Sequence, residues 1–382
     1  MNTLDFYTSS VAPRLIDSTL RDGEQAPGVS FSREEKLHVA HLLDAVGVDE
    51  IEAGTPAMGE DEVETIRVIT RAKLKCRISV WSRALEQDIE MAARTGAQGI
   101  HMAFPLSDIQ LNTIGKDWFW VCDALPALVE YAHRYFPFVS VGAQDASRTD
   151  KTRLFQYLAL VQQSGVNRVR IADTVGLFTP ILLYQLIREI KSAFPLLEID
   201  FHGHNDLGMA TANAITAWQA GAGYLSVTVN GLGERAGNSP LEEVMTTLAT
   251  VYNSTKFTPE KLTSLCSFVS EYSGRSIPVG KAVTGSMVFA HESGIHAQGT
   301  LRNAQAFQPF DGKLVGRESA HNVFGKHSGK AAIIHFFNQR NLFLDSNDLD
   351  LIINKIHQVS IHLKRNLSVS EMLNVYNEIH CL

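Results

Sequence analysis

The pattern of apolar and polar positions alternates between short apolar runs and longer amphipathic segments over most of the chain. Most of the apolar runs are rich in Val and Ile and carry a polar group at their end, as expected for buried parallel strands. The segments between them have helical periodicity, and several end near a glycine suited to a helix C-terminus (Gly47, Gly96, Gly165). Eight apolar runs fit this description: RLIDST (14–19), EIEAG (50–54), RISVWS (77–82), GIHMAFP (99–105), FVSVGAQ (138–144), RVRIADT (168–174), EIDFHGH (198–204) and YLSVTVNG (224–231).

The spacing of these runs predicts the fold class. Between residues 14 and 224 a new run starts about every 30 residues, the period of a strand plus a returning helix in a parallel sheet. Eight such units favour a closed (β/α)₈ TIM barrel over an open doubly wound sheet. The first run is also not followed by the GxGxxG turn of a dinucleotide-binding fold. We therefore expect an α/β protein built on a TIM barrel.

The pattern changes after the predicted barrel. We expect an N-terminal extension at residues 1–12 and the barrel at 13–270. Residues 271–327 contain Gly, Pro and histidine-bearing loops with weak periodicity, which indicates a linker subdomain. Residues 328–382 return to helical patterns and predict a small helical C-terminal subdomain.

Composition narrows the class of protein. The chain has 382 residues, of which 45% are hydrophobic and 20% charged, as in ordinary globular proteins. A net charge of −7 does not favour nucleic acid or an anionic membrane as a partner. No apolar stretch reaches the roughly 18 residues of a membrane helix, and the N-terminus lacks the pattern of a secretory signal. Four dispersed cysteines without a CxxC pair argue against a disulfide framework and predict a cytoplasmic location.

Polar residues follow nearly every predicted strand. Catalytic groups of a (β/α)₈ barrel lie at the C-terminal ends of its strands, so this recurrence predicts an active site there. The residues are Asp17, Arg21, Asp22, Glu52, His101, Gln144, Asp145, Asp173, Thr174, His202, His204, Asn230 and Glu234.

The stretch FHGHND (201–206) points to a metal site. Side chains two apart on a strand share a face, so His202 and His204 should point together into the barrel mouth. Two histidines that are simply hydrogen-bonded at a strand end are the plainer interpretation. Asp22 and Asn238 favour the metal, because strands one, seven and eight adjoin once the barrel closes. Such a mixed N/O set suits Mg²⁺, Mn²⁺, Zn²⁺, Co²⁺ or Fe²⁺ and leaves positions open for a substrate.

An open divalent ion of this kind can chelate the carboxylate and keto oxygen of a 2-oxo acid and polarise its carbonyl. Arg21 stands next to Asp22 and is placed to stabilise negative charge on oxygen in the transition state, although a surface salt bridge is the alternative. Thr174 is a candidate for binding a substrate carboxylate, although Thr at a strand end is common.

Five longer motifs resemble one enzyme family. They are LIDSTLRDGEQAPG (15–28), HGHNDLGMATANA (202–214), NGLGERAGNSPLEEV (230–244), HESGIHAQG (291–299) and FGKHSGKAA (324–332). They resemble the acetyl-CoA-dependent condensing enzymes that include the 2-isopropylmalate, homocitrate and citramalate synthases. The phrases RDGEQAPGVSFS and QDASR, with the short chain, look most like the homocitrate synthases of nitrogen fixation.

The resemblance implies an acyltransferase with a role in amino-acid biosynthesis. Acetyl-CoA would condense with 2-oxoglutarate, and thioester hydrolysis would release (R)-homocitrate and CoA. By the family pattern, Arg21 and Gln25 fall on substrate-contact positions and Thr174 on a carboxylate-binding one. His296 matches a histidine that helps to deprotonate the acetyl methyl group from a partner subunit, which implies a homodimer. The family's metal-site positions match Asp22, His202, His204 and Asn238.

Two positions depart from the family pattern. Gln144 stands where relatives usually have Glu, and an amide cannot take a proton. If that Glu supports enolisation, the step here should be slower or rely more on His296. Phe307 appears where relatives have tyrosine, which removes a hydroxyl group. On its own, His296 sits in a stretch that we expect to be a loop, where a histidine is either simply exposed or available as a catalytic base.

Three alternatives remain open at this point. A 3-hydroxy-3-methylglutaryl-CoA lyase shares the RDG and HxHN motifs, but its members usually have a cysteine in the loop after strand eight, and NGLGERAGNSP has none. A 2-isopropylmalate or citramalate synthase differs in the 2-oxo acid, and these enzymes usually add a regulatory domain that this chain does not show. A non-catalytic binding protein is the third, suggested by Gln144 and Phe307.

Overall fold

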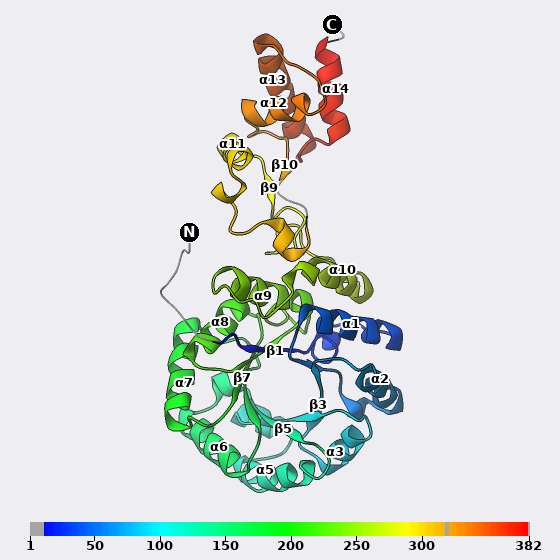
Figure 1. The fold of residues 1–382 in the computed structure, drawn as a ribbon. Coiled ribbons are helices and arrows are strands. Elements are labelled where there is room, and N and C mark those ends of the chain that lie inside the picture. The colour runs from blue at the N-terminus through cyan, green and yellow to red at the C-terminus, as the bar shows by residue number, and fades with distance from the viewer. Residues whose placement is uncertain (1–10, 318–320, 381–382) are drawn as a thin grey trace. The chain divides into compact units, whose positions relative to one another are not determined.

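The computed structural model describes residues 11–317 and 321–380, and within them the first part of the chain closes into a barrel of eight parallel strands (Figure 1). The strands follow chain order, and the last pairs with the first through Asp17 and Val227. The predicted TIM barrel is therefore confirmed. Its strands are β1 (Arg14–Asp17), β2 (Glu50–Glu52), β3 (Arg77–Arg83), β4 (Gly99–Pro105), β5 (Phe138–Gln144), β6 (Arg168–Asp173), β7 (Ile199–Gly203) and β8 (Tyr224–Val227).

The helices form a ring around the strands (Figure 1). The first of them shows why the sequence folds this way: Ser32 and Glu35 form a reciprocal capping box at its start, and Val39 and Leu43 are fully buried one turn apart. The helices of this region are α1 (Arg33–Val46), α2 (Glu60–Arg71), α3 (Glu86–Ala93), α4 (Asp108–Thr113), α5 (Trp118–Ala132), α6 (Lys151–Gln163), α7 (Pro180–Ala193), α8 (Ala210–Ala220), α9 (Leu241–Thr250) and α10 (Leu262–Ser273).

The strands of the barrel place apolar side chains on their outer face and charged side chains in the barrel interior. Along β6, Val169 and Ile171 are fully buried on one face, while Arg168 and Arg170 alternate with them and reach acidic side chains of β2 across the barrel. Such buried charges are tolerated only when they are paired and hydrogen-bonded. The interior is thus a network of ion pairs beneath the ends of the strands.

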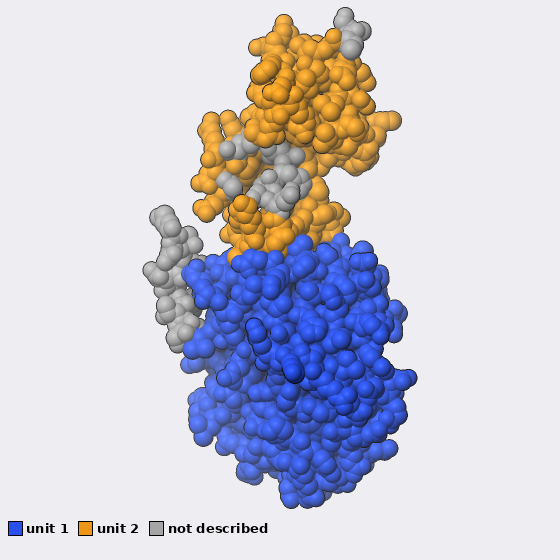
Figure 2. Space-filling view, turned by 45° about the vertical axis from the view of Figure 1, so that its right-hand side comes forward, with its two compact units in different colours: residues 1–277 blue, residues 278–382 orange. Residues whose placement is uncertain are grey.

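The chain divides into two compact units, with the boundary between Ile277 and Pro278 (Figure 2). Within its described residues, the second unit contains a two-stranded sheet of β9 (Ala290–His291) and β10 (His321–Asn322) and the α-helices α11 (Gly294–Arg302), α12 (Lys330–Asn338), α13 (Ser346–Leu363) and α14 (Val369–His380). The helical region predicted after the barrel is confirmed. The separation of a linker subdomain from a helical subdomain stays a prediction, as does the extension at 1–12, which lies mostly outside the described residues.

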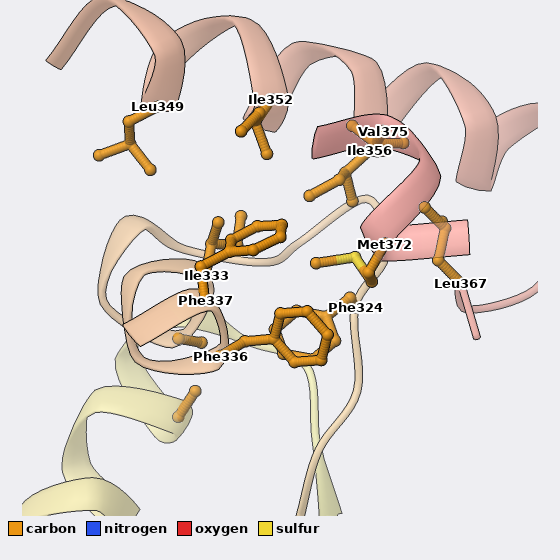
Figure 3. Close-up of a cluster of buried hydrophobic side chains, with 12 residues drawn as sticks. Phe324, Ile333, Phe336, Phe337, Leu349, Ile352, Ile356, Leu367, Met372 and Val375 are labelled. Atoms are coloured by element: carbon orange, nitrogen blue, oxygen red, sulfur yellow. The ribbon is translucent and has the colours of Figure 1, made fainter. Parts of the chain in front are cut away.

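The second unit has its own hydrophobic core (Figure 3). Ile352 and Ile356 of α13 face Phe337 of α12 and Met372 of α14, and all four are almost completely buried. Apolar residues four apart on α13 share one face of the helix, which is the pattern that predicted helices here. The unit is therefore held together by packing between α12, α13 and α14.

Candidate active site

Three side chains from two strand ends converge at the mouth of the barrel. Asp22 follows β1, His202 lies on β7 and His204 directly follows it. Asp22 Oδ2 lies 3.2 Å from His202 Nε2 and 3.9 Å from His204 Nε2, and the two imidazole Nε2 atoms are 3.4 Å apart. All three residues are buried, and one ligand atom from each could bind the same ion. The expected convergence of His202, His204 and Asp22 is present.

Asn238, on the loop after β8, is a further candidate for an oxygen ligand. Its backbone bridges to His204, and its side-chain amide donates to the Leu232 carbonyl at 3.1 Å. The other side-chain atom, Oδ1, is buried and has no hydrogen-bond partner among the described residues. A buried amide oxygen without a partner is costly unless a ligand binds it. The donor set of two imidazoles, a carboxylate and an amide oxygen therefore fits a divalent ion.

The loop after β8 holds Asn238 in place through its glycines. Gly237 has φ = 85°, and a Cβ atom there would lie 1.9 Å from the Gly231 carbonyl oxygen. Only glycine is compatible with that position. Arg235 ties the same loop to its neighbours, because it binds both carboxylate oxygens of Asp206 and the Thr174 carbonyl. Asp206, next to the HxH pair, is thus a loop anchor.

Electrostatics keep the Asp22 carboxylate and the His204 imidazole in the protonation state that a metal requires. Burial alone would raise the pKa of Asp22, but Arg21 and the two imidazoles outweigh it and hold that pKa well below its usual range. Burial, with the neighbouring His202, lowers the pKa of His204 to about 4. At neutral pH the carboxylate is therefore ionised and the His204 imidazole neutral, as metal ligands must be.

Arg21 is fixed beside this group by two carboxylates. Its Nη1 lies 3.2 Å from Asp22 Oδ1, and its Nε donates to Glu52 Oε2 at 2.5 Å. The side chain is 8% exposed, so the exposed salt bridge considered as an alternative is ruled out. Glu52 in turn accepts from Arg170 Nη1 at 3.1 Å. Arg21 is thus held by the buried ion pairs of the barrel interior.

A cavity of about 250 Å³ opens beside the three candidate ligands. Arg21, Gln25 and Thr174, the predicted substrate-binding residues, all border it, as does Gln144, which was predicted as a catalytic position. The Thr174 hydroxyl oxygen accepts a hydrogen bond from the Asp145 backbone amide, so its own O–H points elsewhere. The lining residues are Arg21, Asp22, Gln25, Trp81, His101, Ala103, Gly142, Gln144, Arg170, Ala172, Thr174, His202, His204, Glu234 and Arg235.

Other polar strand-end residues serve the scaffold. Asp173 accepts the backbone amides of Leu177 and Phe178, and the Asn230 amide donates to the Cys266 carbonyl. Asp145 binds Arg148. In the sequence these residues follow a strand just as the site residues do, because carboxylate and amide side chains also stabilise turns. The sequence distinguished a scaffold residue from a site residue only where a motif was present.

Trp81 and Arg170 were missed by the sequence prediction, although both line the cavity. The signal for Arg170 was present: RVRIAD carries arginine at alternate positions of an otherwise apolar strand. Alternate positions of a barrel strand face the interior, so two arginines there should have indicated buried charge near the site.

His296 belongs to the second unit and lies on α11, so the loop expected there is wrong. Ala297, the next residue, is fully buried in the core of that unit, and this packing stabilises a short helix whose periodicity is too brief to detect in the sequence. The His296 side chain is exposed and stacks on Phe307, with ring centroids 4.2 Å apart.

Two family models match the chain. One, described as HMGL-like, covers residues 12–269, and another, described as homocitrate synthase post-HMGL domain-like, covers residues 283–364. The chain belongs to the HMGL-like family. The suspected resemblance to condensing enzymes of this family is thereby confirmed.

Relatives of this HMGL-like chain include synthases with different products. It is 40% identical to "2-isopropylmalate synthase 2" of Caldanaerobacter subterraneus subsp. tengcongensis, over 96% of this chain and 95% of the relative. It is 39% identical to "Homocitrate synthase 1" of Nostoc sp., over 95% of this chain and 96% of the relative. A synthase that condenses a 2-oxo acid with acetyl-CoA is supported. Because a 2-isopropylmalate synthase matches over nearly its whole length, chain length does not separate the two activities.

Solved structures agree on the fold. An HMG-CoA lyase from Acinetobacter baumannii, in complex with coenzyme A and 3-methylmalate, superposes with a TM-score of 0.65 at 18% identity, covering 73% of this chain and 97% of that one. At this identity the likeness concerns the barrel alone. None of the described helices combines the length and the apolar character that a membrane crossing requires.

Proposed function

We propose that this chain is a homocitrate synthase, which condenses acetyl-CoA with 2-oxoglutarate and releases (R)-homocitrate and CoA. The observation that carries the proposal is the group formed by Asp22, His202 and His204, completed by the unpartnered Asn238 Oδ1. Beside it Arg21 is held rigid by Glu52. Such a site fits a small anionic molecule with an adjacent keto group.

Asp22, His202, His204 and Asn238 would hold one divalent ion, of the set Mg²⁺, Mn²⁺, Zn²⁺, Co²⁺ and Fe²⁺. When bound, it would supply a Lewis acid for the carboxylate and keto oxygen of the 2-oxo acid. The Thr174 hydroxyl is assigned to the substrate carboxylate, because its oxygen is already an acceptor and its proton is available to donate. Arg21 is assigned to the negative charge that develops on the keto oxygen.

The bond changes are those of a Claisen condensation followed by hydrolysis. A base removes a proton from the acetyl methyl group, the resulting carbon attacks the keto carbon, and the keto oxygen gains a proton. Water then cleaves the thioester, so that one carboxylate forms and CoA leaves as a thiol. We assign the base to His296, supplied by a second copy of the chain in a homodimer. Gln144 borders the cavity and can orient the thioester by hydrogen bonding, but it cannot carry the proton.

A 2-isopropylmalate synthase is the second candidate, favoured by the 40% identical relative of that name. The two differ in the 2-oxo acid, which is 2-oxoisovalerate in the second case. A thiol assay separates them. Metal-loaded protein is incubated with acetyl-CoA and, in turn, 2-oxoglutarate, 2-oxoisovalerate or pyruvate.

We expect CoA release with 2-oxoglutarate and little release without a 2-oxo acid. Faster release with 2-oxoisovalerate would favour the second candidate. An absence of release with all three acids would overturn both synthase assignments and favour a binding protein. Protein treated with a chelator is the control, and it should be inactive until metal is restored.

A further inference from the structure

The cavity beside the candidate metal ligands has a charged floor. Three strands place small residues in its wall: Ala103 on β4, Gly142 on β5 and Ala172 on β6. Arg170 borders the same cavity, two residues before Ala172 on β6, and is therefore one step further down the barrel on the same face. The small side chains leave room above a guanidinium group.

The guanidinium of Arg170 is held on one side and unpaired on the other. Nε donates to Asp200 Oδ2 at 2.5 Å, and Nη1 donates to Glu52 Oε1 at 3.1 Å. Nη2 is buried and has no hydrogen-bond partner in the part of the chain that the structure describes. The residue is only 2% exposed, so bulk water does not satisfy this donor. An unpaired buried guanidinium N–H group is costly unless something in the cavity accepts from it.

None of the described side chains around Arg170 accepts a hydrogen bond from Nη2. His101 also borders the cavity, with Nδ1 3.0 Å from Ser140 Oγ. Burial and the nearby arginines hold the pKa of His101 well below its usual value, so its imidazole is neutral. Glu52 and Asp200 are already bound to Arg170 by its other nitrogens. Arg170 Nη2 therefore remains as a donor for a ligand, while Glu52 and Asp200 occupy the other nitrogens.

We propose that Arg170 is a specificity-determining residue that binds the distal carboxylate of a dicarboxylic 2-oxo acid through Nη2. The inference rests on the proposed function, since it takes the 2-oxo end of the substrate to lie at Asp22, His202 and His204. An apolar substrate of the same length would bury a methyl group against Nη2 and leave the donor unpaired. A site built around a polar partner rejects an analogue lacking that partner strongly, by roughly 100-fold or more.

The test compares two substrates and two matched variants. The substrates are 2-oxoglutarate and 2-oxopentanoate, which have the same chain length and differ by a carboxylate in place of a methyl group. Arg170→Lys keeps the positive charge and removes the Nη2 donor. Arg168→Lys is the control, because Arg168 is a buried arginine of the same strand that is paired with Glu50 and does not border the cavity.

We expect kcat/KM of the wild-type protein for 2-oxoglutarate to exceed that for 2-oxopentanoate by roughly 100-fold or more. Arg170→Lys should lower this ratio at least about tenfold, because the loss on 2-oxoglutarate exceeds any loss on 2-oxopentanoate, and Arg168→Lys should leave it unchanged. A wild-type ratio near one, or a ratio that Arg170→Lys leaves intact, would overturn the inference. Either result, with CoA still released, leaves the condensing activity standing; no CoA release with any 2-oxo acid refutes the proposed function instead.

A crystal structure of the wild-type protein with 2-oxoglutarate decides the point if Arg170→Lys does not fold. The inference expects the distal carboxylate within hydrogen-bond distance of Arg170 Nη2. A distal carboxylate bound elsewhere, or a water molecule on Nη2 with the substrate in place, contradicts it.

Discussion

Glu52→Gln tests whether the buried ion pairs of the barrel position Arg21. Glu52 is completely buried and accepts from Arg21 at 2.5 Å and from Arg170 at 3.1 Å. The amide removes the negative charge between two guanidinium groups and presents an N–H donor to one of them. Breaking a buried ion pair from one side costs about 3–5 kcal/mol. A barrel of this size would lose roughly 2–4 °C in Tm for each kcal/mol.

Glu50→Gln is the matched control. Glu50 lies on the same strand, is equally buried, and forms a two-bond ion pair with Arg168 at 2.8 and 2.9 Å, at the end of the barrel away from the candidate ligands. We expect both variants to lose comparable stability in thermal unfolding followed by circular dichroism. Only Glu52→Gln should also lower kcat/KM, by roughly 10- to 100-fold, because Arg21 is then free to move by an ångström or so.

The two variants can refute this reasoning in either of two ways. Unchanged kcat/KM in Glu52→Gln, despite lower stability, would show that Glu52 does not position Arg21. An equal loss of kcat/KM in Glu50→Gln would show that general loosening of the barrel, and not the position of Arg21, controls the rate. Assays well below the Tm of both variants keep the comparison free of unfolded protein.

Three further predictions concern acid stability, turnover and the second unit. Burial disfavours the Glu50 carboxylate, but Arg168 outweighs burial and lowers the pKa of Glu50 to about 2. The ion pair of Glu50 therefore stabilises the fold above pH 4.5 and is lost as the pH falls towards 2. Over that pH range the urea midpoint should drop less steeply for Glu50→Gln than for the wild-type protein, and equal slopes for the two proteins would refute the assignment. Gln144→Glu should raise kcat by restoring a group that can carry a proton, and an unchanged kcat would show that this position is not limiting. Ile352→Ala should destabilise the second unit by about 2–5 kcal/mol, seen as faster amide hydrogen exchange in α12 to α14, whereas unchanged exchange would contradict the role of this core.

The fold was predictable because each strand carries its own signal. Parallel strands buried on both faces read as short apolar runs, and β4 and β5 were predicted with the bounds that the structure shows. The predicted run YLSVTVNG extends past β8, which ends at Val227, because the chain turns into a short 3₁₀ helix at Val229–Gly231. Apolar content alone does not mark the point where a strand leaves the sheet.

The site was predictable where the spacing of residues along a strand determines the direction of their side chains. It was not predictable where a side chain is positioned by partners across the barrel. His202 and His204 are two apart at the end of β7, so their common direction followed from strand geometry. The pairing of Glu52 with Arg21 and Arg170 joins β2, β6 and the segment after β1, and no local pattern reveals which charges meet inside a closed barrel. The helix that carries His296 depends on burial of Ala297 in the core of the second unit.

Metal binding by stripped protein tests the central claim most directly. Chelator-treated wild-type protein should bind one Mn²⁺ or Zn²⁺ per chain in a calorimetric titration. His204→Ala should weaken this binding by more than about 100-fold, since it removes a direct ligand. His38→Ala, which replaces an exposed histidine on α1, should leave it unchanged. Wild-type binding that survives His204→Ala unaltered, or wild-type protein that binds no divalent ion, would contradict the account.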